Sequence, residues 1–375
     1  MESYRIDKET LYIHDFKQIF DYRSSQEWRS MITRLIIEEG VKEIPDGAFN
    51  YFENLREAIL PDSLKRIGGT AFESCKNLCK IVLPEGLEYL GSYAFQDACA
   101  LRKLSFPKSL TELGENALYI GDGSRLFSIV VSPENPAFTS VDGVLFTKDM
   151  SRLLKYPSAK RAADYAVPES VREIADGAFS HTRYLHKVKL PEKLEKLQSG
   201  VFSFCNHIEE LEIPDTVEGI PSYAFFCCER LKKLTLPEKA EYLGYESICN
   251  CSLLEAVRIP SGITQIDYAA VGGNPQLEEL VIPEGVTELC NSALIDDTGL
   301  KEIVLPSTLL EIWDHAFQRC ESLEEITIPE NVKYIDDEAF EGCKSLRTVY
   351  MRSPHINGSG FLPEGLRAQV RIISE

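Results

Sequence analysis

The chain has 375 residues, a formal net charge of −19 with histidine neutral, and 44% hydrophobic residues. A charge this negative argues against nucleic acids and anionic membrane surfaces as partners, because both attract basic patches. The hydrophobic content is enough for a continuous core, and no window approaches the roughly 18 apolar residues that would predict insertion into a membrane as a helix.

Residues 1–34 precede a repeated pattern and are predicted to form an N-terminal cap. Tyr4–Asp7 and Leu11–Ile13 flank a polar pair, Lys8-Glu9, which is typical of a hairpin, and an amphipathic stretch through Trp28 follows. The first residues contain no apolar segment of the kind found in signal peptides. We therefore expect a cytoplasmic protein, or a cell-surface or secreted one if the chain is a processed or truncated form.

From residue 35 onward, the sequence repeats with a period of 23 residues around a proline. Each copy reads approximately L-x-x-I-x-I-P-x-x-V-x-x-I-x-x-x-A-F-x-x-C-x-x-L. Self-similarity at such a period predicts a solenoid, in which each repeat packs only on its neighbours. The prolines of this frame are Pro61, Pro84, Pro107, Pro168, Pro191, Pro214, Pro237, Pro260, Pro283, Pro306 and Pro329.

Each repeat is predicted to build one rung of the solenoid. Leu234 and Leu236 alternate with polar residues, which predicts a strand with one buried face, and Pro237 ends it. In Leu83-Pro84-Glu85-Gly86, we expect a type I turn with Pro84 as its second residue. A return segment then carries a phenylalanine inward, and stacking of this column predicts a core spine. The column contains Phe49, Phe72, Phe95, Phe179, Phe202, Phe225, Phe317 and Phe340, with Leu118, Ile248, Val271 and Leu294 in the other repeats.

Cysteine occupies a second column, three residues after the phenylalanine. We predict buried, reduced thiols there, because free cysteine is a compact core residue. A disulfide between adjacent rungs is the alternative, since strands in a sheet lie about 4.8 Å apart. The six cysteines of this column are Cys75, Cys205, Cys228, Cys251, Cys320 and Cys343.

We predict one continuous solenoid domain with a parallel strand ladder of roughly 13 rungs, of the α/β type or mostly β. Repeats are expected over residues 35–132 and 168–353. A hairpin unit at 133–167, with turn signals at Asp142-Gly143 and Lys148-Asp149, interrupts them. Residues 354–375 are predicted to form a C-terminal cap that ends in a closing strand at 370–373.

The repeat unit resembles the BspA-type leucine-rich repeat of bacterial and some protist proteins. The segments Asn135–Phe146 and Leu153–Pro157 resemble that family's hairpin unit, and Trp28 to Phe49 resembles its entry into the first repeat. The resemblance implies a leucine-rich repeat fold used for binding, without a conserved active site. It also implies a bacterial origin, and the family is known for extracellular adhesins.

No catalytic motif or cofactor-binding motif is present, and we predict a protein that is not an enzyme and needs no cofactor or metal. His181, His186 and His207 are interpreted as residues of a solvated surface, and the carboxylates around Glu210 as an exposed acidic rung. An enzyme with a site near the hairpin unit, at residues 121–157, is the alternative from another functional class.

The outward positions of the strands carry uneven charge. Those of four N-terminal strands sum to +5, and those of the remaining strands sum to −4. Chance variation of surface charge is one interpretation, and a binding face is the other. On the second, the chain is a non-catalytic scaffold for a protein partner with an acidic surface, or for a glycan; a bacterial surface adhesin is an alternative. The predicted partner-binding residues are Lys80, Arg102, Lys103, His186, Lys187 and Lys189.

Overall fold

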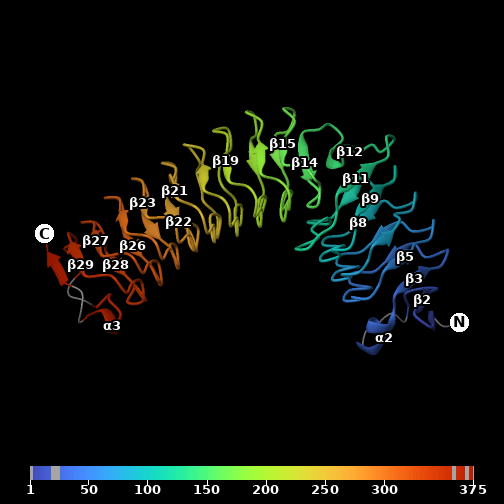
Figure 1. Ribbon diagram of the computed structural model, residues 1–375, viewed down its shortest axis with the longest axis horizontal. Helices are drawn as coiled ribbons and strands as arrows, with labels where there is room; N and C mark the ends of the chain where they lie inside the picture. The colour runs from blue at the N-terminus through green and yellow to red at the C-terminus, as the bar shows by residue number, and fades with distance from the viewer. Residues whose placement is uncertain (1–2, 18–25, 357–359, 368–370, 375) are drawn as a thin grey trace. The chain divides into compact units, whose positions relative to one another are not determined.

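The computed structural model describes residues 3–17, 26–356, 360–367 and 371–374 (Figure 1). It confirms a leucine-rich repeat solenoid of parallel strands, mostly β rather than α/β, with about 15 turns over the described residues. Roughly 13 rungs were expected from the proline frame. The caps explain the difference, because β2 (Thr10–Ile13) and β30 (Arg371–Ser374) pair in parallel with the repeat strands beside them and so add rungs.

The chain divides into two compact units. The first contains residues 1–161 and 176–184, and the second contains residues 162–175 and 185–375. The predicted arrangement of caps, repeats and hairpin unit within one continuous domain stays a prediction.

Short strands dominate the first unit. Its described elements are β1 (Tyr4–Asp7), β2 (Thr10–Ile13), α2 (Gln26–Met31), β3 (Arg34–Ile37), β4 (Glu43–Ile44), β5 (Glu57–Ile59), β6 (Arg66–Ile67), β7 (Lys80–Ile81), β8 (Tyr89–Leu90), β9 (Lys103–Phe106), β10 (Glu112–Leu113), β11 (Ser128–Val131), β12 (Phe138–Val141), β13 (Val144–Thr147) and β14 (Arg152–Lys155).

The second unit continues the same kind of rung. Its described elements are β15 (Asp164–Ala166), β16 (Glu173–Ile174), β17 (Lys187–Lys189), β18 (Lys196–Leu197), β19 (Glu210–Glu212), β20 (Lys233–Thr235), β21 (Ala256–Val257), β22 (Gln265–Ile266), β23 (Glu279–Val281), β24 (Glu288–Leu289), β25 (Glu302–Val304), β26 (Glu311–Ile312), β27 (Glu325–Ile328), β28 (Tyr334–Ile335), β29 (Thr348–Met351), α3 (Glu364–Arg367) and β30 (Arg371–Ser374).

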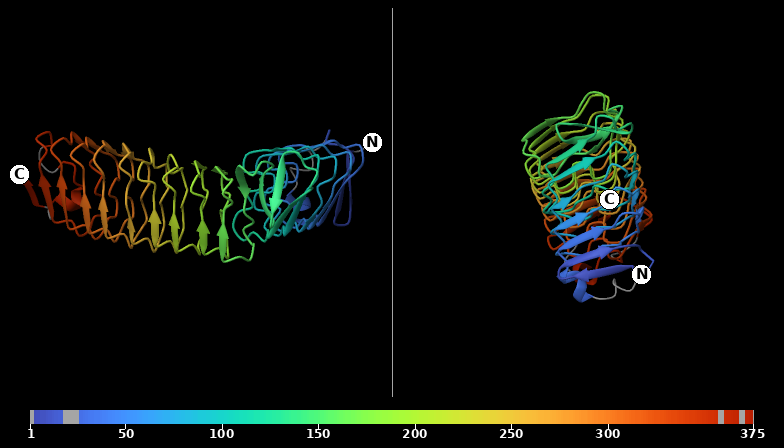
Figure 2. Two further views of the ribbon diagram at one scale, coloured as in Figure 1. Left: turned by 90° about the horizontal axis from the view of Figure 1, so that it is seen from above. Right: turned by 90° about the vertical axis from the view of Figure 1, so that its right-hand side faces the viewer.

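The strands that precede each proline form the first ladder of each unit, and they run in the same direction (Figure 2). In β17, Val188 is buried while Lys187 and Lys189 are exposed, and the neighbouring strands repeat this alternation. Register is constant: residues paired across the ladder, such as Leu211 and Leu234, lie one repeat apart. The predicted period of two, with one face in the core, is therefore confirmed.

A second, shorter ladder follows each proline, and the sequence pattern did not predict it. Two-residue strands pair in parallel here, as β4 and β6 do through Ile44 and Ile67. The turn before this ladder also differs from expectation. Its hydrogen bond runs from the N–H of Leu87 to the carbonyl of Pro84, at 3.0 Å, so Pro84 is the first residue of the turn and not the second.

Two antiparallel hairpins are present, one at each of the predicted turns. β1 and β2 pair antiparallel around Lys8-Glu9, and β12 and β13 pair antiparallel around Asp142-Gly143. β14 adds to the second hairpin after the turn at 148–151. The closing strand is present as β30, although residue 370 of the predicted segment lies outside the described residues.

The phenylalanine column forms the predicted core spine. All eight phenylalanines are fully buried. Neighbouring rings stack within each unit: the centroids of Phe72 and Phe95 are 5.7 Å apart, and those of Phe317 and Phe340 are 5.1 Å apart. The backbone beside the rings is also paired between rungs, as in the 2.9 Å hydrogen bond from the N–H of Phe317 to the carbonyl of Ala339.

Burial of the cysteine column is confirmed at all six positions. Five of these thiols donate to the backbone carbonyl of the spine residue 26 positions earlier; Cys228, for example, lies 3.1 Å from the carbonyl oxygen of Phe202. Asn274 takes the same place in its rung and donates from Nδ2 to the carbonyl of Ile248 at 3.0 Å. Where this column contains cysteine or asparagine, the side chain can therefore donate to a carbonyl of the spine, whereas Phe52 and Ala98 fill the column without a donor.

Asp297 is the one carboxyl group in this column. It is fully buried, and its Oδ1 accepts the N–H of Asn274 at 2.8 Å, but its Oδ2 has no partner among the described residues. Burial raises the pKa of Asp297 well above its ordinary value. A protonated carboxyl suits this position better than a carboxylate does, because a buried charge without a counter-charge is costly.

We expect Phe225→Ala to destabilise the solenoid by about 3–5 kcal/mol, because it removes a fully buried ring stacked on Phe202 and leaves a cavity. Urea unfolding provides the measurement. Tyr245→Ala is the control, since Tyr245 is 53% exposed and its loss should change stability by less than about 0.5 kcal/mol. Equal midpoints for the two variants would contradict a core spine.

We expect Cys205, Cys228 and Cys251 to be unreactive thiols in the native protein and reactive ones in denaturant. All three are buried, and burial raises the pKa of Cys251 to about 12, which suppresses the reactive thiolate. Exposed Cys79 is the internal control and should react at once. A Cys205–Cys228 or Cys228–Cys251 bridge, detected by mass spectrometry after purification without oxidant, would overturn the prediction.

We expect Asp297→Asn to stabilise the protein at pH 7 by about 1–3 kcal/mol, because asparagine keeps the acceptor for Asn274 and carries no ionisable group. Above pH ~4, the unfolded chain releases the Asp297 proton while the folded chain retains it, so wild-type stability falls as pH rises. The gain in the variant should shrink between pH 7 and pH 4. A gain that is independent of pH would show that Asp297 does not titrate in this way.

Candidate functional site

The outward side chains of the first ladder form a regular surface, called here the strand face. At the strand position that lies two residues before the proline in regular repeats, several rungs carry an exposed apolar residue. Val82 is 69% exposed and Val281 is 60% exposed, while the residues beside them in sequence are buried. Aliphatic side chains repeated in a row on a polar surface are typical of binding surfaces. The exposed members of this column are Ile59, Val82, Val130, Val281 and Val304.

In the first unit, the predicted residues Lys80, Arg102 and Lys103 are all exposed on the strand face. Lys80 is not available as an isolated charge, because it is hydrogen-bonded to Glu57 on the preceding strand. This hydrogen bond lowers the pKa of Glu57, and Arg34 adds a second ion pair to the same carboxylate at 3.0 Å. Arg102 and Lys103 form no ion pair within the described residues.

In the second unit, the predicted residues His186, Lys187 and Lys189 line a hollow of about 860 Å³ on the strand face. Its other side is acidic and carries Glu210 and Glu212, as expected for this rung. Glu210 lies 3.4 Å from Lys233 on the next strand. The two lysines and these carboxylates line the same hollow, so both signs of charge are available to a ligand.

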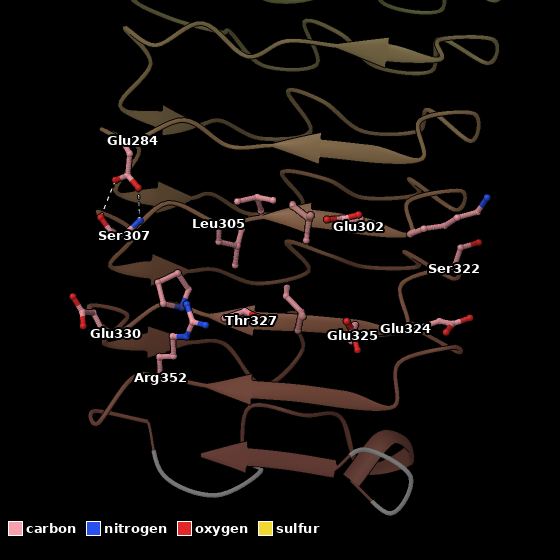
Figure 3. Close-up of a pocket in the computed structure, with 15 residues that line it drawn as sticks. Glu284, Glu302, Leu305, Ser307, Ser322, Glu324, Glu325, Thr327, Glu330 and Arg352 are labelled. Atoms are coloured by element: carbon pink, nitrogen blue, oxygen red, sulfur yellow. Dashed lines mark hydrogen bonds between the residues drawn. The ribbon is translucent and has the colours of Figure 1, made fainter. Parts of the chain in front are cut away.

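A further hollow of the second unit, about 970 Å³, is mostly acidic (Figure 3). Glu302 and Glu325 project from neighbouring strands, β25 and β27, on the same side of the sheet. Glu284 is fixed by Ser307, whose N–H and hydroxyl both donate to it at 2.9 Å. These hydrogen bonds lower the pKa of Glu284 and keep it ionised.

A basic hollow of about 640 Å³ lies in the first unit, where the chain enters the strands next to the hairpin unit. Arg102 is the one lining residue that the sequence analysis selected. The other lining residues were missed because they stand at or before the starts of strands in irregular repeats. In the sequence analysis, charge was summed only over the outward positions of the regular strands. The lining contains no carboxylate and no thiol. Its residues are Arg102, Arg125, Phe127, Ala159, Lys160, Arg161, Arg183 and Tyr184.

His181 is placed differently from the prediction, whereas His186 is exposed as predicted. His181 is not on a solvated surface: it packs on Tyr119 with ring centroids 5.9 Å apart, and burial lowers its pKa to about 4. His186 and His207 lie close together, at 5.5 Å between centroids. His186 is exposed, and burial lowers the pKa of His207.

His315, which the sequence analysis did not consider, has carboxylates on both ring nitrogens. Nδ1 lies 2.5 Å from Asp314, and Nε2 lies 3.0 Å from Glu341 and 3.5 Å from Glu338. Asp314, His315 and Glu338 could together present three metal-ligand atoms. Partial burial opposes protonation of the ring, but the Asp314 hydrogen bond and the three carboxylates outweigh it and raise the pKa of His315. The arrangement thus favours the protonated ring, and a metal ion at this position would have to displace that proton.

Comparison with known proteins identifies the fold and the family. No curated protein matches the chain. A leucine-rich repeat protein from Eubacterium ventriosum is similar in structure, with 20% identity, a TM-score of 0.63, and coverage of 89% of this chain and 90% of the other. The pneumococcal vaccine antigen PcpA is 26% identical with a TM-score of 0.58, over 92% of this chain and 78% of the antigen.

Among the described residues, no helix has the length and apolarity needed to cross a membrane. A model of the BspA-type leucine-rich repeat region matches in six copies over residues 26–131, 159–276 and 272–361. These matches cover most of the solenoid, including the strands that form the strand face. The chain therefore belongs to the BspA-type leucine-rich repeat family.

Proposed function

We propose that this protein is a non-catalytic scaffold that binds a partner protein through its strand face. The observation that carries the proposal is the column of exposed aliphatic side chains there. Val281 and Val304 are paired across β23 and β25 and remain 60% and 48% exposed. Burying such a column against a partner would remove apolar area from water, at about 25 cal/mol per Å² before the costs of association.

Charge on the strand face of the second unit supports a protein rather than a glycan as partner. Within this unit, an acidic hollow and the cations Lys187 and Lys189 present opposite signs of charge. A patterned field of this kind fits a complementary protein surface and chiefly raises the rate of association. The partner surface that meets Lys187 and Lys189 is accordingly acidic, as is any surface that meets Lys103 of the first unit.

A surface adhesin or host-interaction protein is the second candidate. The likeness to the pneumococcal vaccine antigen favours it. Antibodies raised against the chain decide between the two locations: labelling of intact cells of the native host supports a surface role, and labelling only after permeabilisation contradicts it.

We expect the variant Lys103→Glu, Lys187→Glu, Lys189→Glu to associate with a captured partner about tenfold more slowly at low salt, because electrostatic steering is reversed. Partners are captured from native-host lysate, cross-linked to identify contacts on the strand face, and then tested by surface plasmon resonance. The difference should shrink at 1 M salt, where the Debye length is about 3 Å.

The matched control is Lys196→Glu, Lys239→Glu, Lys333→Glu, which changes the net charge equally at exposed positions outside the first ladder. If both variants slow association to the same degree, the effect is one of net charge, and the strand face is not the binding surface.

A further inference from the structure

The basic hollow of the first unit, called here the arginine pocket, is chemically unlike the rest of the chain. Five of its eight lining residues are cations and none is acidic, on a chain of net charge −19. Two of the other three, Phe127 and Tyr184, are large aromatic residues left 48% and 42% exposed. Cations and exposed aromatics gathered in one hollow are the residue types that dominate binding sites.

Backbone pairing between four successive segments builds the pocket. The N–H of Arg125 donates to Cys99 and that of Phe127 to Arg102, both at 2.9 Å. The next segment is joined by the 2.8 Å hydrogen bond from Ala159 to Leu126. The last is joined by a 2.9 Å bond from Arg183 to Ser158. Adjacent segments in such a ladder lie about 4.8 Å apart, so the arginines are brought together by rungs far apart in sequence.

The arginines of the pocket lack the counter-charges that several cations have elsewhere in this chain. On other rungs, a carboxylate stands one repeat away: Lys301 lies 2.8 Å from Glu278, and Arg319 lies 2.6 Å from Asp296. Within the described residues, the guanidinium groups of Arg102, Arg125, Arg161 and Arg183 form no ion pair or hydrogen bond. Lys160 is held in place by the carbonyl of Asp142, at 2.6 Å. Clustered like charges repel one another, so an anionic ligand would remove a repulsion that otherwise destabilises the folded state.

We propose that the arginine pocket binds an extended acidic segment of a partner protein, with carboxylates alternating with apolar residues. This assignment rests on the proposed protein-binding function but uses different residues. Guanidinium groups bind carboxylates through paired hydrogen bonds, and Phe127 and Tyr184 offer apolar surface for the aliphatic stems of the acidic side chains.

Length and polarity favour a peptide over a sulfated glycan. Four segments span about 14 Å, which an extended peptide covers with four to five residues, and side chains on one of its faces recur every ~6.7 Å. Two or three carboxylates thus reach the pocket cations. A sulfated glycan would instead place hydroxyl and sulfate groups beside the Phe127 ring, which cannot hydrogen-bond them.

The test uses the full chain and a fluorescein-labelled peptide with the core Glu-Val-Glu-Val-Glu, followed by fluorescence anisotropy. The matched probe Gln-Val-Gln-Val-Gln should not bind. Arg125→Gln with Arg183→Gln should weaken binding of the acidic peptide by at least about tenfold, because two charge-assisted hydrogen-bonding groups are lost. Arg230→Gln with Arg258→Gln removes two exposed arginines of the second unit and should leave the affinity unchanged. Phe127→Ser should weaken binding without changing the urea midpoint.

Three results would overturn the assignment. The pocket variants could bind as the wild type does, which places the site elsewhere. The Gln peptide could bind equally well, which removes the electrostatic argument. A heparin-derived oligosaccharide could bind more than about tenfold tighter than the peptide at the same ionic strength, which makes the ligand an acidic glycan. The peptide assay needs no natural partner, so it tests the arginine pocket alone. The variant at Lys103, Lys187 and Lys189 tests the proposed binding function of the strand face separately.

Discussion

Backbone hydrogen bonding from each rung to the next is the constraint on which the rest of this structure depends. The strand residue Leu211 pairs with Leu234, and on the opposite side of the rung the N–H of Phe225 donates to Ser247 at 2.8 Å. Because both sides of the rung are paired, residues at the same repeat position are immediate neighbours. Residues at one repeat position therefore form a row of side chains in contact with one another. Each row favours residue types that pack well against their own kind.

In the core, this rule selects two kinds of row. Rings stack well on rings, which suits the phenylalanine spine, where Phe202 and Phe225 are nearly parallel at 6.0 Å. In the cysteine row, compact side chains instead donate hydrogen bonds to backbone carbonyls beside the spine. The cysteine thiols and the side-chain amide of Asn274 both act as hydrogen-bond donors. The Asp297 carboxyl can donate a hydrogen bond only when it is protonated, so the stability of that rung depends on pH.

On the surface, the same rule brings charges one repeat apart into contact. Opposite signs then give ion pairs, as for Lys76 and Glu53 at 2.7 Å and Lys344 and Glu321 at 2.7 Å. Each exposed pair contributes little stability, but together they neutralise the surface row by row. Places where this neutralisation fails are therefore informative. The arginine pocket is such a place, and it lies where the regular repeat gives way to the hairpin unit.

The sequence by itself determined the solenoid, its parallel ladder, its two hairpins and its buried columns, because these follow from a period of 23 residues and an alternation of two along each strand. Tertiary structure alone decided the second ladder, the burial of His181 against Tyr119, and the partnership of Lys80 with Glu57. The arginine pocket could not be predicted for the same reason. Arg102, Arg125 and Arg183 stand at different repeat positions in irregular rungs, so no single column contains them, and only the pairing of those rungs in space brings them together.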